Sequence, residues 1–220
     1  MKAAIFEEFG GPEVLRVVEV ERPVPGVGEV LVRVRAASLN HLDLWVRRGL
    51  PIETTMPHIG GSDIAGIVVD VGEGVDRGRI GARVVVNPAL SCGRCAWCAA
   101  GEVSLCPKFR ILGEHTNGGF AEYVTVPATN VHDIPDGIDF ETAACLPVSY
   151  QTAWRAVVTR GRVRPGEEVL VVGASGGTAV AIVQTALLAG ARVHAVTSGP
   201  DKVESLRSLG AHFVYDRQVV

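Results

Sequence analysis

The chain has 220 residues, of which 47% are hydrophobic and 20% charged, and its formal net charge is −3. This composition is typical of a globular protein with a sizeable core, and the absence of a basic run argues against nucleic acid as a partner. The longest apolar stretch, 178–190, contains Gln184 and is too short to span a bilayer. We therefore expect a cytoplasmic protein that binds neither nucleic acid nor a membrane.

Residues 1–135 are predicted to form a β-rich domain. Val32, Val34 and Ala36 alternate with Arg33 and Arg35, the period of two that is typical of a half-buried strand. Glycine- and proline-containing turns separate runs of this kind, which favours a β-barrel or sandwich. The expected strands cover residues 2–6, 14–19, 29–36, 64–71, 82–87 and 121–126.

Four of the five cysteines lie close together within a predicted lobe at 91–107. Cys92, Cys95, Cys98 and Cys106 have the spacing C-x₂-C-x₂-C-x₇-C. Four thiolates that close on one ion, with no open position, describe a structural Zn²⁺ site. Two disulfides, an iron–sulfur cluster or separate core thiols are the alternatives. No export signal is evident at the N-terminus, and clustered cysteines in a reducing compartment usually bind metal, so we expect one zinc ion.

Residues 136–220 change to an alternation of helices and strands. Strands are predicted at 167–172, 191–197 and 212–215, with helices at 177–189 and 201–209. This βαβαβ order is typical of a parallel Rossmann sheet. Small residues at its first turn would let backbone N–H groups approach a pyrophosphate at the positive end of the following helix. The predicted cofactor-binding residues of this turn are Gly173, Ser175, Gly176, Gly177 and Thr178.

The end of the second predicted strand bears on the choice of dinucleotide. An acid there would bind the ribose hydroxyls of NAD and repel a 2′-phosphate, but this chain has Thr197 and Ser198. Lys202 can supply positive charge, and Arg217 can add a guanidinium. These residues predict NADP(H). The alternative is that Thr197 and Ser198 only cap the next helix.

Taken together, these motifs resemble the medium-chain dehydrogenase/reductase family, which includes zinc alcohol dehydrogenases and zinc-free quinone oxidoreductases. Further matching segments are 40–43 (NHLD), 61–63 (GSD), 118–123 (GGFAEY) and 152–154 (TAW). The resemblance runs along nearly the whole chain. It implies a mixed α/β fold, with a GroES-like β-barrel domain at 1–135 and a partial Rossmann domain at 136–220.

The resemblance also implies that the catalytic zinc is lost. Zinc alcohol dehydrogenases have cysteine where Asn40 stands, Gly-His-Glu where residues 61–63 read Gly-Ser-Asp, and a second cysteine at the position of Val148. Oxygen donors of this kind suit zinc poorly. Zinc-free members of the family reduce quinones and α,β-unsaturated carbonyls with NADPH. Asn40 and Thr152 are then the expected hydrogen-bond donors to a developing oxyanion, and His41 and His115 are candidate proton donors. For the remaining histidines, at 58, 132, 194 and 212, we expect no functional cluster.

The chain stops after the third strand of the expected Rossmann sheet, whereas members of the family are longer. The first strand should keep one neighbour, so its free edge is expected to pair with a complementing chain or a second copy. We also expect the isolated chain to show little turnover. The function predicted is NADPH-dependent reduction of a quinone, enone or related small molecule. The alternatives are an alcohol dehydrogenase with unusual ligands and a non-catalytic zinc-bearing remnant that binds nucleotide or a protein.

Overall fold

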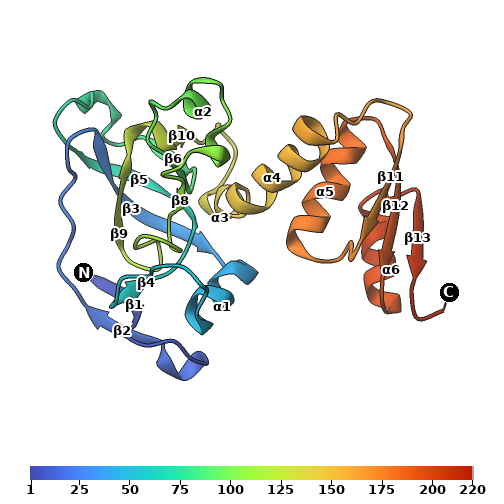
Figure 1. The fold of residues 1–220 in the computed structure, drawn as a ribbon, viewed down its shortest axis with the longest axis horizontal. Coiled ribbons are helices and arrows are strands. Elements are labelled where there is room, and N and C mark those ends of the chain that lie inside the picture. Colours follow the sequence, from blue (N-terminus) through green and yellow to red (C-terminus); the bar gives the residue numbers. More distant parts are fainter. Residues whose placement is uncertain (220) are drawn as a thin grey trace. The chain divides into compact units, whose positions relative to one another are not determined.

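The structure is a computed structural model that describes residues 1–219 (Figure 1). The chain divides into two compact units, Met1–Pro147 and Val148–Val220, which are described separately. The first unit continues past the expected boundary at residue 135, because helix α3 (Phe140–Ala144) buries Ala143 and Ala144 against Ala65 and Ile134. Asp139 caps this helix, since its Oδ1 accepts a hydrogen bond of 2.7 Å from Thr142 N.

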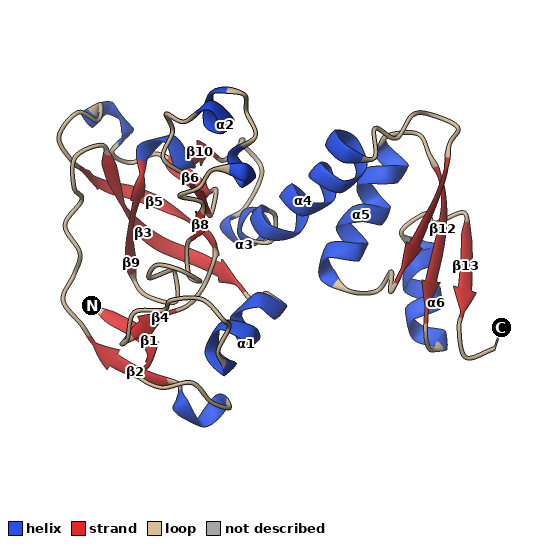
Figure 2. Ribbon diagram, in the orientation of Figure 1, coloured by secondary structure: helices blue, strands red, loops and turns tan. Residues whose placement is uncertain are grey.

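The first unit is built on two antiparallel sheets (Figure 2). The larger sheet has the order β10-β6-β5-β3-β9, and its strands are β3 (Glu29–Ser38), β5 (Asp63–Val71), β6 (Arg83–Val86), β9 (Tyr123–Pro127) and β10 (Val131–Asp133). The smaller sheet has the order β2-β1-β4, with β1 (Lys2–Phe6), β2 (Arg16–Glu19) and β4 (His58–Ile59). A bridge between Ala3 and Ala121 connects β1 to the segment before β9. The six strands expected from the sequence are all present, whereas the short strands β4 and β10 were not predicted.

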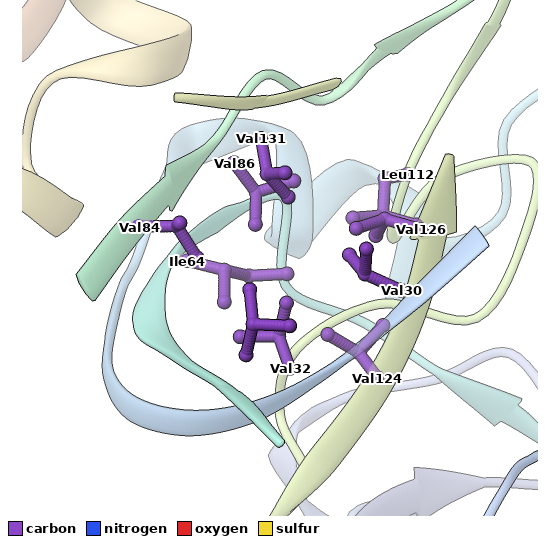
Figure 3. Close-up of a cluster of buried hydrophobic side chains, with 10 residues drawn as sticks. Val30, Val32, Ile64, Val84, Val86, Leu112, Val124, Val126 and Val131 are labelled. Carbon is purple, nitrogen blue, oxygen red and sulfur yellow. The ribbon is translucent and has the colours of Figure 1, made fainter. Parts of the chain in front are cut away.

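The core of this unit lies inside the larger sheet (Figure 3). Alternate residues of the strands, among them Val30 and Val32 on β3 and Val84 and Val86 on β6, point toward one another and are almost fully buried. Arg33 and Arg35 are exposed, as the period of two predicts. This core holds β3, which ends at Ser38, in register with β5, which begins at Asp63. Those two residues are therefore paired across the two strands.

The second unit contains a parallel sheet with the order β11-β12-β13. Its elements are β11 (Glu168–Val172), α5 (Gly177–Leu188), β12 (Arg192–Thr197), α6 (Pro200–Ser208) and β13 (Phe213–Asp216), within about one residue of the predicted bounds. Val171, Val193 and Ala195 pack with residues of both helices in one core. The opposite face of the sheet is open to solvent, and Leu170 and Val172 on it are 64% and 73% exposed.

Shorter elements complete the fold. The remaining helices and strands are α1 (His41–Arg48), α2 (Ala96–Ala99), α4 (Pro147–Trp154), β7 (Ala89–Leu90) and β8 (Arg110–Ile111). The single turns and irregular helices are η1 (Pro12–Val14), η2 (Arg77–Arg79), η3 (Val103–Leu105), η4 (Ala128–Asn130) and η5 (Arg155–Arg160). Of the helices formed by residues 1–219, none combines the length and apolarity that crossing a membrane requires.

Candidate functional site

Four cysteine sulfurs converge in the lobe after β7. The Sγ atoms of Cys92, Cys95, Cys98 and Cys106 all lie within 4.8 Å of one another. Individual separations are 3.5 Å for Cys95–Cys98, 3.6 Å for Cys92–Cys106 and 4.0 Å for Cys92–Cys98. Cys95 is the N-cap of α2 and Cys106 follows η3, so two short helical turns bring the ends of the motif together. The four thiols form no disulfide.

These separations fit a tetrahedral metal site. A Zn–S bond of about 2.3 Å places the sulfurs of a tetrahedron about 3.8 Å apart. Hydrogen bonds from the backbone of Arg94 and Cys95 lower the pKa of Cys92 to about 6. The backbone of Cys98 lowers the pKa of Cys95, but burial and the neighbouring thiols outweigh it and raise that pKa to about 11. A divalent cation would offset the repulsion between thiolates, so the residues present fit a structural zinc ion.

Asn40 occupies the N-cap of α1 and is held by a buried carboxylate. Its Nδ2 donates a hydrogen bond of 2.9 Å to Asp63 Oδ2, which also accepts one of 3.0 Å from Ser38 Oγ. Asp63 is only 1% exposed. Because only the nitrogen end of the amide can donate to a carboxylate, this contact fixes the orientation of the Asn40 side chain. One N–H of Nδ2 is used by Asp63, which leaves the other for a ligand.

Two unpartnered oxygens lie in the segments next to this contact. Asp43 Oδ2 accepts a hydrogen bond of 2.7 Å from Asn40 N, but Asp43 Oδ1 is buried with no hydrogen-bond partner. Burial raises the pKa of Asp43, and the nearby Asp63 carboxylate adds to this, against backbone hydrogen bonds that lower it. Ser62 is fully buried and its Oγ also has no partner. The hydroxyl is the only side-chain group that Ser62 offers there, so this position supplies no nitrogen ligand.

The other predicted catalytic residues make contacts of their own. His41 is exposed, and the centroid of its ring lies 5.1 Å from that of Trp45 in an edge-to-face arrangement. Thr152 belongs to the second unit, on α4, where its Oγ1 donates a hydrogen bond of 2.7 Å to Val148 O. His115 Nδ1 accepts a hydrogen bond of 3.1 Å from Ile111 N, so that nitrogen is already used within the loop. Each of these three side chains therefore makes a contact within its own unit.

The glycine-rich turn between β11 and α5 has the form that a pyrophosphate requires. Gly173 has a φ of +71°, and a Cβ built on it would meet no atom within 4 Å. Gly176 is the N-cap of α5 and Gly177 its first residue, with no side chain capping the helix. Because the first N–H groups of a helix have no carbonyl ahead of them, they remain available to an anion. Ser175 and Thr178 flank this opening.

The end of β12 is close to that turn. Thr197 is buried and its Oγ1 donates a hydrogen bond of 3.0 Å to Ser175 Oγ. Ser198 is half-buried, and Lys202 on α6 is exposed. Arg217 lies just after β13, and its backbone N donates to Thr197 O at 2.9 Å. All the predicted cofactor residues of the second unit thus lie at the carboxyl ends of its strands, as the Rossmann pattern predicts.

Sequence reasoning missed two groups of residues. Asp216, the last residue of β13, accepts hydrogen bonds from Gly199 N at 3.3 Å to each carboxylate oxygen. The predicted strand stopped at 215, and one more residue would have placed this acid beside Thr197. His194 was expected to lack a cluster, but it contacts Glu168 and lies 2.9 Å from Tyr215 Oη. The signal that could have revealed these contacts of His194 was the parallel register of β11, β12 and β13. That register brings alternate residues of the three strands onto one face of the sheet.

Comparison with known proteins gives the family. Residues 26–136 match the alcohol dehydrogenase GroES-like domain. Over 216 residues the chain is 38% identical to an alcohol dehydrogenase of Schizosaccharomyces pombe, covering 97% of this chain and 61% of the relative. A crystal structure of an NAD-dependent alcohol dehydrogenase superposes with a TM-score of 0.96 at 46% identity, covering 99% of this chain and 64% of that one. A zinc-binding dehydrogenase of Sinorhizobium meliloti 1021 bound to NADP has a TM-score of 0.87 at 32% identity, with coverage of 100% and 62%.

The chain therefore belongs to the medium-chain dehydrogenase/reductase family, a family of oxidoreductases, and the relatives reported above include alcohol dehydrogenases. It spans about 60% of the length of these relatives. The GroES-like domain and the Rossmann-type parallel sheet that the sequence predicted are both confirmed.

Proposed function

We propose that this chain belongs to a nicotinamide-dependent oxidoreductase that transfers hydride to a quinone, enone or other conjugated carbonyl without a catalytic zinc. The observation that carries the proposal is the Asn40–Asp63 contact. The resemblance to the family implies that its catalytic-metal ligands stand at these segments. The residues there are an amide already bonded to a carboxylate and a buried serine hydroxyl, which suit Zn²⁺ poorly. Among the described residues, the cysteine lobe is the one convergent group of three or more potential metal-binding side chains of His, Cys, Asp or Glu.

The roles of the chain's own residues follow from this geometry. The nicotinamide cofactor supplies the hydride when bound. Asp63 holds the Asn40 amide so that its second Nδ2–H can donate to a substrate oxygen, where negative charge develops as hydride adds to a conjugated carbon. Thr152 would have to turn its hydroxyl away from Val148 O before it could donate as well. His41 is exposed, which suits a proton donor that exchanges with water.

The cysteine lobe supports a separate, structural role for one zinc ion. Its four sulfurs leave no ligand position open for substrate, so the ion would contribute stability and not chemistry. A reducing, cytoplasmic location would keep the thiols available to the metal.

For the cofactor, the residues of the second unit support nicotinamide dinucleotide binding through the adenosine half. The sequence-based expectation of NADP(H) draws on Lys202 and Arg217, which offer positive charge near the end of β12. Asp216 opposes it with a carboxylate at the same edge.

The relatives' names favour a second candidate, the interconversion of an alcohol and a ketone or aldehyde. The two candidates differ in the carbon that receives hydride. Because the chain spans about 60% of the length of its relatives, we would join it to the carboxyl-terminal part of such a relative. We would then incubate the joined protein with nicotinamide cofactor deuterated at the transferable position and with an enone, and locate the label by NMR. Deuterium on the β-carbon supports the proposal, and deuterium on the carbinol carbon supports the alcohol dehydrogenase. Unlabelled substrate contradicts both and favours the non-catalytic remnant.

We also propose a protein partner at the open side of the second unit, either a second copy or a complementing chain. Within residues 1–219, β11 pairs with β12 alone, so its other edge presents unpaired backbone groups. On the same strand, the exposed apolar side chains of Leu170 and Val172 offer a partner a hydrophobic contact.

A further inference from the structure

The carboxyl ends of β12 and β13 carry an acid on which the choice of dinucleotide depends. Asp216 is the Cα partner of Thr197 across these strands, and adjacent strands lie about 4.8 Å apart. We propose that Asp216 makes this unit select NAD(H), with its free 2′-hydroxyl, over NADP(H). The inference rests on the proposed dinucleotide-binding function, and it reverses the preference that the sequence alone predicts.

The route of the ligand past Asp216 follows from the contacts of the strand ends. A pyrophosphate at the start of α5 lies against the turn that contains Ser175, and Ser175 Oγ is 3.0 Å from Thr197 Oγ1. The adenosine ribose leaving that pyrophosphate therefore reaches the end of β12. Thr197 stands where a Rossmann domain that binds NAD usually has its ribose-binding acid. Its side chain is 3% exposed and its hydroxyl proton is already donated to Ser175, so it is not available to the ribose.

Asp216 is held at this edge by backbone donors. Gly199 has a φ of +95°, a conformation that few residues other than glycine adopt, and it turns its N–H toward both Asp216 oxygens at 3.3 Å. Gln218 N adds a hydrogen bond of 3.0 Å to Oδ1. The carboxylate is thus fixed beside Ser198 and Gly199, where it can accept a hydrogen bond from a ribose hydroxyl. A 2′-phosphate there, with a charge of about −1.5 to −2, would be repelled.

The opposing positive charges are less well placed. Lys202 and Arg217 are both exposed, and a long side chain loses rotamer freedom when it binds a phosphate in one geometry. Solvent also screens exposed charges more strongly than a fixed group at the strand ends. Asp216 therefore outweighs them in setting the preference.

The test uses two probes that contain only the adenosine half, ADP-ribose and 2′-phospho-ADP-ribose, titrated calorimetrically into the 220-residue chain. Wild type should bind ADP-ribose at least about tenfold more tightly. Asp216→Asn keeps one acceptor oxygen, which can serve Gly199 N and Gln218 N as Oδ1 does in wild type, but removes the charge. It should bind the phosphorylated probe about tenfold more tightly than wild type does, with the Kd of ADP-ribose changed by less than about threefold.

Asp136→Asn is the matched control, because it removes one exposed acid from the first unit and should leave both Kd values unchanged. Thermal unfolding of each variant shows that it folds, and Asp216→Ser is a second variant if Asp216→Asn does not. The inference is overturned if wild type prefers the phosphorylated probe, or if Asp216→Asn changes the Kd of both probes equally. Either result leaves the proposed function standing. Binding of neither probe overturns the proposed dinucleotide site and the inference with it.

Discussion

Asp43 is a half-buried carboxyl whose two oxygens differ in their hydrogen bonds. Its Oδ2 retains the hydrogen bond to Asn40 N that begins α1, whereas Oδ1 has no partner. The carboxyl is the type of group that orients an imidazole ligand from behind, and here the neighbouring residue is Ser62. The unpartnered oxygen supports our proposal that this site has exchanged its metal ligands.

We predict that Asp43→Asn does not destabilise the protein at neutral pH and stabilises it by up to about 1 kcal/mol, or about 2–4 °C, after allowance for partial exposure. Burial raises the pKa of Asp43 in the folded state. Its contribution is therefore most favourable below the unfolded pKa and declines as pH rises through the folded pKa. Asparagine removes the ionisation and keeps an acceptor for Asn40 N. The melting temperature measured from pH 4 to 7 should fall less with rising pH in the variant than in wild type, and parallel curves would contradict the assignment.

At the scale of elements, glycines allow a loop of the first unit to pack closely against the segment that precedes Ser62. A Cβ on Gly118 would lie 2.2 Å from Gly61 O and 2.6 Å from Gly113 Cα, all backbone atoms. The loop from Gly113 to Gly119 therefore rests directly on the segment that leads into Ser62 and Asp63. Backbone hydrogen bonds from Gly118 N to Ile59 O at 2.7 Å and from Gly119 N to Gly61 O at 2.8 Å secure it.

Gly118→Ala should destabilise the first unit by about 3 kcal/mol, because the added methyl group meets backbone that cannot move without breaking these bonds. Gly26→Ala is the control, since its Cβ would meet only the flexible carboxylate of Glu29, at 3.2 Å. Chemical denaturation should give a lower midpoint for Gly118→Ala and little change for Gly26→Ala. Equal midpoints for the two variants would show that the loop is not packed as described.

Patterns within single elements could be predicted from the sequence. The alternation of Val32 with Arg33 gave strand β3, the glycine-rich turn gave the start of α5, and the cysteine spacing gave the four-sulfur cluster. Contacts between elements could not be predicted in this way. The Asn40–Asp63 bond depends on the β3–β5 register, which pairs Ser38 with Asp63, and the position of Asp216 depends on the exact end of β13. One residue of error in a strand end hides such a contact.

At the scale of the whole molecule, we propose that the open sheet face of the second unit governs association with another chain. Helices α5 and α6 share a core with one face of the sheet, while the other presents Leu170, Val172, Phe213 and Tyr215, each at least 38% exposed. An apolar sheet face beside an unpaired edge favours association with another chain.

Leu170→Lys should weaken self-association, because it places a charge on that face in the middle of β11, the strand with the unpaired edge. Leu188→Lys is the matched control, since Leu188 on α5 is 89% exposed on the helical side of the unit. Sedimentation velocity over a concentration series should shift Leu170→Lys toward the monomer and leave Leu188→Lys like wild type. If wild type is monomeric at every concentration, a second copy is excluded as the partner, and co-purification then tests for a complementing chain. If both lysine variants associate as wild type does, this sheet face is not the interface.

The central claim is that this chain keeps a structural zinc site and lacks a catalytic one. Metal analysis of the purified protein by mass spectrometry tests it most directly. The account predicts about one equivalent of zinc per chain, and its loss in Cys95→Ser, because all four sulfurs share one ion. Two equivalents in wild type, or one equivalent that survives Cys95→Ser, would contradict the account.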